Sequence, residues 1–429
     1  MSRFFSQTST GAVMGILGGI AACVFLACVT EWGHFIPSAN VATDYATALV
    51  LAFGIGLALW ISPLSREDRR ILAVLWILRC LTTLGFMLLY ENNYGLDAYT
   101  YYLEAKEINF DTSLTGFGKG TGNIGWLIWY INKWLPSSNS YHALKVIFSL
   151  IGLLSIYLIY SAAIRYSGRR NPRLLLFLGA FPSVVFWSSI LGKDPIMLLG
   201  ISVYAAGVLY WMATRNLIWI LPAFAGAVLA SSIRPWTAFI LALPMLPLGF
   251  FYVRGAFYRV GYALFSVALL FLSAQIFVEH FTFKSVDDLV RKTNIISRSW
   301  SVGGSRQEVP EFQSIGEMIA FAPAGMFTAL LRPLPGEVRN LFGTLAGIEN
   351  LFLLFLIYLS IRRFTWRRLF DPAAVWAISL LFSWSFIYSY VSYQNLGSAF
   401  RFRLQVLPLL LLLLAYLAQR QEPEMPAEE

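Results

Sequence analysis

The feature that most constrains the fold of this chain is a repeated run of about twenty apolar residues, the length with which a helix crosses a bilayer. We count about twelve such runs, near residues 11–30, 43–62, 71–90, 142–163, 172–190, 195–213, 217–233, 235–253, 260–278, 341–361, 372–392 and 404–419. A backbone in lipid must satisfy its hydrogen bonds internally, so each run predicts a helix. We therefore expect an all-α, polytopic integral membrane protein in which residues 1–429 form a single membrane domain.

Composition excludes a soluble protein of several domains. Hydrophobic residues make up 58% of the 429 residues and charged residues only 13%, whereas a soluble domain carries about 25% charged residues. The net charge of +9 would favour nucleic-acid binding in a soluble protein. Here the basic residues are spread among the loops between apolar runs, so we expect no nucleic-acid partner.

Short arginine-rich loops predict the orientation of the chain. Four of them contain Arg66/Arg69/Arg70, Arg165/Arg169/Arg170/Arg173, Arg254/Arg259 and Arg362/Arg363/Arg367/Arg368. The positive-inside rule places all four in the cytoplasm, together with both termini. The first run, 11–30, is long for the apolar part of a signal peptide, so we predict a retained span. We expect a multi-pass protein of the bacterial inner membrane.

This topology requires that residues 316–335 do not cross the membrane. The segment is short, holds three prolines and contains Glu317 and Arg332. We predict an interfacial or re-entrant segment whose backbone is satisfied by surrounding protein; an ordinary span is the alternative. Two long loops, 91–141 and 279–340, then face outward. In the first, residues 99–110 and 124–135 alternate apolar and charged positions at helical spacing, which predicts helices lying along the membrane surface.

Charged residues gather near the outward ends of the apolar runs, where burial of an ionised group is costly. The set comprises Asp97, Lys193, Asp194, Arg234, Arg298, Arg306, Arg332, Arg339, Arg401 and Arg403. Guanidinium groups bind phosphates through paired hydrogen bonds, so the set favours the phosphate or pyrophosphate of a lipid carrier as ligand. The alternative for each residue is that it extends to the interface or pairs with a loop carboxylate.

Asp97 begins the first outer loop, just beyond the third apolar run. A carboxylate at the boundary between lipid and water can take the proton of an incoming hydroxyl group. It can equally cap the helix that LDAYTYY would begin. Both interpretations stay open at the level of the sequence.

An Asp just outside an early span, followed by surface helices, resembles the GT-C glycosyltransferase superfamily. Three stretches are similar to bacterial members and to polysaccharide-assembly proteins: FPSVVFWSSILGKDP (181–195), LRPLPGE (331–337) and QNLGSAFRFRLQVLP (394–408). The resemblance covers about residues 75–415 in layout. One departure is that the Asp loop follows the third apparent span, whereas the family places it after the first.

The resemblance implies roles for individual residues. Asp97 would be the general base that activates an acceptor hydroxyl, and the donor would be a sugar on a polyprenyl phosphate. The carrier phosphate would meet Lys193, Arg234, Arg332, Arg401 and Arg403. Supporting roles would fall to Asp194, which we expect to orient Lys193, to Glu349 inside a span, and to Asn395. The acceptor would be a glycan or a lipid.

Two other functions remain open. One is an O-antigen or exopolysaccharide polymerase that uses a pyrophosphate-linked oligosaccharide and paired arginines. The other is a lipid-carrier flippase or transporter, although the two halves show no similarity and the charges gather on one face. A metal cofactor is not expected, because the histidines are far apart and the cysteines lie in apolar stretches: His34, His142, His280, Cys23, Cys28 and Cys80.

Overall fold

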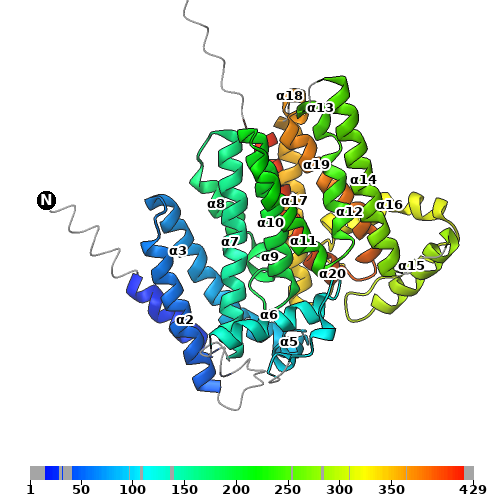
Figure 1. The fold of residues 1–429 in the computed structure, drawn as a ribbon. Helices are drawn as coiled ribbons and strands as arrows, with labels where there is room; N and C mark the ends of the chain where they lie inside the picture. Colours follow the sequence, from blue (N-terminus) through cyan, green and yellow to red (C-terminus); the bar gives the residue numbers. More distant parts are fainter. Residues whose placement is uncertain are drawn as a thin grey trace, which may run out of the picture.

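The computed structural model describes residues 15–28, 31, 41–95, 97–106, 110–135, 140–252, 255–281, 285–308, 310–363 and 365–419. Over these residues the chain is all-helical (Figure 1), as the apolar runs predict, and the only strand-like pairing is an isolated bridge between Arg306 and Asn395. Most long helices run side by side, and large buried side chains such as Trp376, Trp384 and Phe148 fill the space between them.

Six helices among the described residues are long and apolar enough to cross a membrane. They are α2 (Val41–Ile61), the continuous helix Arg66–Asn93, α7 (Tyr141–Ser167), α10 (Lys193–Thr214), α17 (Leu341–Arg363) and α19 (Pro372–Val391). Helix α20 (Leu396–Phe402), the turn η6 (Arg403–Gln405) and α21 (Leu407–Leu417) form a pair bent by 68°, which is a seventh candidate if it counts as one span. These helices indicate a membrane protein.

Four of the remaining predicted runs fold into shorter or broken helices. They correspond to the helix Gly15–Cys28; α8 (Pro172–Gly179) with α9 (Pro182–Trp187); η4 (Leu217–Trp219) with α11 (Ile220–Ile233); and α12 (Thr237–Ala242), η5 (Leu243–Met245) and α13 (Leu248–Tyr252). The fifth lies in α14 (Ala256–Phe281), which is 26 residues long. Prolines account for two of the breaks, because Pro182 begins α9 and Pro244 lies in η5, and a proline cannot donate to the preceding turn. Hydropathy alone therefore predicts more full-length spans than the structure contains.

The first long loop contains a helix in each of the two segments for which the sequence predicts one. Helices α5 (Ala98–Glu104) and α6 (Gly120–Trp134) lie with α20 at one end of the bundle, which we call the α5–α6 end (Figure 1, bottom). Helices α8, α13 and α18 (Trp366–Leu369) lie at the opposite end. Along α6, Trp126 stacks on Tyr130, whose ring neighbours Trp134, and all three are exposed. Such an aromatic row is typical of helices at a membrane interface.

Helix α16 (Ile315–Leu331) corresponds to the segment predicted not to cross. Near its beginning, the Met318 carbonyl accepts a hydrogen bond from the Tyr390 hydroxyl at 2.6 Å. Just after its end, Arg332 donates to Gln307, whose backbone N–H donates in turn to the Gln394 carbonyl. Tyr390 lies in the last turn of α19, and Gln394 follows that helix, which ends at Val391. Both ends of α16 are thus tied to the region where α19 ends.

Small residues allow the close packing that places the functional groups. A side chain at Gly200, Gly207 or Gly226 would collide with backbone atoms of the facing helix, so α10 and α11 approach each other directly. This kind of contact is common between helices in membranes. It holds the start of α10, which carries Lys193 and Asp194, beside the end of α11, which precedes Arg234.

Candidate functional site

A cavity of about 710 Å³ opens at the α5–α6 end. Its charged lining comes from Asp97, Glu104, Lys119, Lys193, Arg234 and Arg401, and its aromatic lining from Trp236, Trp300 and Phe402. We call it the basic cavity, because cations outnumber carboxylates in its wall. It brings together four residues that the sequence predicted to act together but that lie far apart along the chain: Asp97, Lys193, Arg234 and Arg401.

Asp97 occupies the position just before α5, but its side chain makes no capping hydrogen bond. Its carboxylate is instead exposed in the wall of the basic cavity. Its charge acts on nearby groups: burial first, and then the negative charge of Asp97, raises the pKa of the Tyr101 phenol. The structure therefore favours a role in the cavity over the capping interpretation.

Lys193 is the first residue of α10, and its Nζ donates a hydrogen bond of 2.8 Å to Oγ1 of Thr121 on α6. Two glycines fix the beginning of α6 at this place. A side chain at Gly120 would collide with the Ile233 carbonyl, and one at Gly122 with the Leu114 carbonyl. These glycines let α6 lie directly against the end of α11 and so set the width of the cavity.

Arg234 follows α11 and is only 8% exposed. Its Nη1 donates to the Tyr388 hydroxyl at 3.1 Å, and its guanidinium lies 4.0 Å from the centre of the Phe402 ring. The Tyr388 hydroxyl in turn donates to Oε1 of Gln405 at 2.9 Å. Among the described residues no carboxylate forms a salt bridge with Arg234. The hydrogen bond and the ring contact fix the orientation of the Arg234 guanidinium group, and its positive charge remains available to bind a ligand.

Arg401 is bound to Asp194, with 2.6 Å between Nε of the arginine and Oδ2 of the aspartate. Asp194 is 1% exposed, and its Oδ1 has no hydrogen-bond partner. We expected Asp194 to orient Lys193, whereas the hydrogen bond that the structure shows for its carboxylate is accepted from Arg401 of α20. The pair joins two segments that are 207 residues apart.

A second cavity, of about 670 Å³, adjoins the basic cavity. Its wall is mostly apolar and aromatic, with Phe86, Tyr90, Phe186, Trp187 and Phe342 among its residues, and we call it the apolar groove. One side is formed by the π-helical turn η1 (Thr82–Phe86), a local widening often found at functional sites. Both cavities share Val302, Asn395, Ser398 and Arg401.

The partition between the cavities is a strap of residues 301–307, held by Asn395. Oδ1 of Asn395 accepts from the Ser305 hydroxyl, and its Nδ2 donates to the Val302 carbonyl, each at 2.8 Å. The Leu396 N–H also donates to the Ser305 carbonyl. Gly303 has φ +80°, which favours glycine. Asn395 thus anchors this strap beside both cavities.

Two of the predicted phosphate ligands, Arg332 and Arg403, do not line the basic cavity. Arg403 is fully buried and pairs with Glu349 at 2.8 Å, and Glu349 also accepts from the N–H and hydroxyl of Ser183. Arg332 pairs with Glu337 at 2.7 Å. Both guanidinium groups are committed to carboxylates of the chain itself. For Arg403 the pairing is required by burial, which makes an unpaired charge costly, whereas the Arg332 pair is partly exposed. Glu349 itself lies at the wall of the apolar groove.

Several cavity residues were missed at the level of the sequence: Glu104, Lys119, Trp236 and Trp300. For Glu104 a signal existed, because it follows Asp97 by seven residues, two helical turns, and so lies on the same helix face. For the tryptophans, nothing in the local pattern separates them from the many interfacial aromatic residues. No group of three or more His, Cys, Asp or Glu side chains placed to hold a metal ion occurs in the part of the chain that the structure describes.

Neither a protein-family model nor a curated protein nor a solved structure matches the chain. Function must therefore be inferred from the two cavities. A cationic wall can hold an anion, an exposed carboxylate can take a proton, and aromatic rings can stack on a sugar. An adjoining apolar groove can hold a hydrocarbon chain.

Proposed function

We propose that the protein is a membrane glycosyltransferase that moves a sugar from a polyprenyl-phosphate-linked donor to an acceptor hydroxyl. The observation that carries the proposal is that Arg401 lines both the basic cavity and the apolar groove. A carrier lipid has its anionic phosphate at the end of a long hydrocarbon chain. With the chain in the apolar groove, the phosphate reaches Arg401, and the attached sugar enters the basic cavity.

The reaction then follows from the cavity wall. Asp97 takes the proton of the acceptor hydroxyl, whose oxygen attacks the anomeric carbon of the sugar. The bond between that carbon and the carrier phosphate breaks, and the phosphate leaves with the electron pair. Lys193, Arg234 and Arg401 stabilise the negative charge that develops on it. The proton on Asp97 passes afterwards to water.

The proposal includes a topology. The α5–α6 end faces the outer side of the bacterial inner membrane, and the arginine-rich loops and both termini face the cytoplasm. Helix α16 is interfacial or re-entrant, since its beginning is tied to Tyr390 in the last turn of α19 and its end is tied through Gln307 to Gln394, just beyond that helix. The shorter and broken apolar helices complete about twelve membrane crossings together with the six long helices.

Of the two enzymatic functions considered, transfer of a single sugar is favoured over polymerisation. The polymerase interpretation relied on paired arginines, and Arg401 and Arg403, two positions apart, are a candidate pair. Arg401 lines the basic cavity, whereas Arg403 is buried against Glu349. One arginine of this pair is therefore left to meet a phosphate.

The experiment that tests the proposal is an assay of the purified protein in liposomes with radiolabelled polyprenyl-phosphate hexoses. We expect release of the labelled sugar from the carrier, to water or to an added glycan. A flippase would move the intact donor between leaflets without cleaving it. Donor that crosses the bilayer uncleaved, with no release of sugar, would contradict the enzymatic proposal and support transport.

A further inference from the structure

We propose that Glu104 is a second functional carboxylate of the basic cavity, which binds the acceptor through its hydroxyl groups and selects against acidic acceptors. This inference rests on the proposed glycosyltransferase function and deepens it. It begins from the position of Glu104, the last residue of α5, in the same cavity wall as Asp97.

The two carboxylates lie on one line along α5. Seven residues separate them, which in an α-helix is close to two full turns and a rise of about 10 Å. Asp97 and Glu104 therefore form one edge of the cavity, at a spacing comparable with the length of a disaccharide. An acceptor whose hydroxyl reaches Asp97 and whose ring extends along α5 passes Glu104.

Space for the Glu104 carboxylate is made by Gly125 on α6. A side chain at Gly125 would come within 3.3 Å of Oε2 of Glu104 and 3.1 Å of the Phe110 ring. The carboxylate is partly exposed, and no described cation forms a salt bridge with it. It differs in this from Asp194, Glu337 and Glu349, each of which is paired with an arginine. An accessible carboxylate left without a cation is an acceptor for hydroxyl protons.

The charges of the cavity come from different elements. Lys193, Arg234 and Arg401 come from the ends of α10 and α11 and from α20, Lys119 lies just before α6, and α5 contributes the two carboxylates, Asp97 and Glu104. The carrier phosphate belongs on the cationic edge, so the acceptor lies along α5. A neutral sugar can donate hydroxyl hydrogen bonds to both carboxylates, whereas the carboxylate of a uronic acid would be repelled. The inferred acceptor is a neutral glycan, and Trp300 or Trp236 provides a ring on which it can stack.

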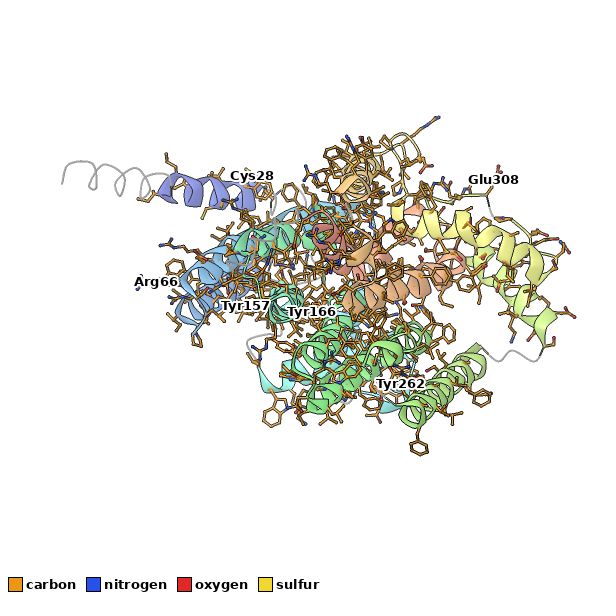
Figure 2. All side chains as sticks on the ribbon, turned by 90° about the horizontal axis from the view of Figure 1, so that it is seen from above. Cys28, Arg66, Tyr157, Tyr166, Tyr262 and Glu308 are labelled. Carbon is orange, nitrogen blue, oxygen red and sulfur yellow. The ribbon has the colours of Figure 1, made fainter. Side chains whose placement is uncertain are left out.

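The test separates transfer to the acceptor from transfer to water. Membrane vesicles of the host strain, lacking the chromosomal gene and complemented with wild type or a variant, contain the natural acceptors and are given radiolabelled polyprenyl-phosphate hexoses. Free labelled sugar reports hydrolysis, and label in glycan reports transfer. The variants are Glu104→Gln, Glu104→Asp and, as a matched control, Glu308→Gln. Glu308 belongs to the second long loop, 279–340. It is exposed and lies at the periphery of the molecule (Figure 2).

For Glu104→Gln we expect the ratio of transfer to hydrolysis to fall at least tenfold, as for loss of a hydrogen bond to a charged group. Glu104→Asp should recover part of the ratio, and Glu308→Gln should leave it at the wild-type value. An unchanged ratio in Glu104→Gln would overturn the inference, and so would equal loss of both products in a variant that unfolds at the wild-type temperature. If wild type gives neither product, the proposed function itself is wrong.

Discussion

Nε of Arg401 donates a hydrogen bond of 2.6 Å to Oδ2 of Asp194, a carboxylate that is almost completely buried. This contact fixes the one cation that belongs to both cavities. The buried carboxylate balances part of the arginine charge and holds the guanidinium at the boundary between the basic cavity and the apolar groove. The position of the donor phosphate in our proposal depends on it.

Asp194→Asn should therefore weaken donor binding, although Asp194 itself lines neither cavity. The amide keeps the size of the side chain but loses the charge-assisted hydrogen bond that orients Arg401. We expect donor affinity to fall about tenfold, measured by binding of radiolabelled polyprenyl phosphate to the protein in detergent. Wild-type affinity in the variant would show that Asp194 does not position Arg401.

The ion pair between Arg332 and Glu337 lies outside the basic cavity and should contribute to the stability of the fold. Burial would raise the pKa of Glu337, but hydrogen bonds from Arg332 and from the Leu334 N–H, with the arginine charge, hold that pKa below its usual value. A depressed carboxylate pKa adds stability above about pH 4.3, the pKa of an unfolded Glu, and this stability is lost as pH falls through the lowered folded value. Between pH 6 and pH 3.5 the thermal unfolding temperature should drop further in wild type than in Glu337→Gln. Equal drops would contradict the pairing.

The buried pair of Glu91 and Lys145 should contribute to folding alone. The two charges are 2.7 Å apart, both side chains are almost fully buried, and Tyr141 donates a further hydrogen bond to Glu91. Glu91→Gln leaves the lysine charge buried without a counter-ion, which costs about 3 kcal/mol or more. We expect a clearly lower unfolding temperature in detergent. In the double variant Glu91→Gln/Lys145→Met the unfolding temperature should fall less than in Glu91→Gln. A larger fall would show that the unpaired lysine charge is not the cause.

Labelling in intact cells tests the proposed topology. In a background with Cys23, Cys28 and Cys80 replaced by serine, a cysteine at Gly304 should react with a membrane-impermeant maleimide. One at Arg69, near the opposite end of the bundle, should react only after the cells are opened. The reverse pattern would place the cavities on the cytoplasmic side, where the proposed reaction has no outer-leaflet donor.

Much of the fold is predictable from the sequence. Seven of the predicted apolar runs mark the long helices and the bent pair, and the glycine and proline positions explain where helices approach or break. The short helices α9 and α12 were predicted as parts of full spans, because hydropathy measures the length of an apolar run and not its continuity. Pro182 was the local sign that the run would break.

Four residues of the basic cavity were predictable from the sequence, but the pairings of the charged residues were not. Asp97, Lys193, Arg234 and Arg401 all stand near predicted span ends, and positions near span ends on one side of a membrane converge. That Arg403 turns inward to Glu349 while Arg401 turns to the cavity depends on the bend between α20 and α21. Residues two positions apart on a helical turn point in nearly opposite directions, so the two arginines could not both face the cavity, but the sequence did not show which of them would.

The central claim is that Asp97 is the general base of a sugar transfer. Because its side chain makes no capping hydrogen bond, Asp97→Asn should leave the unfolding temperature and donor affinity at wild-type values. Turnover of radiolabelled polyprenyl-phosphate hexose should fall by about a hundredfold or more, since the amide cannot take the proton. The deciding measurement is the single-turnover rate of donor cleavage in Asp97→Asn and wild type. A variant rate within about threefold of wild type, well short of the loss expected for a base, would contradict the account.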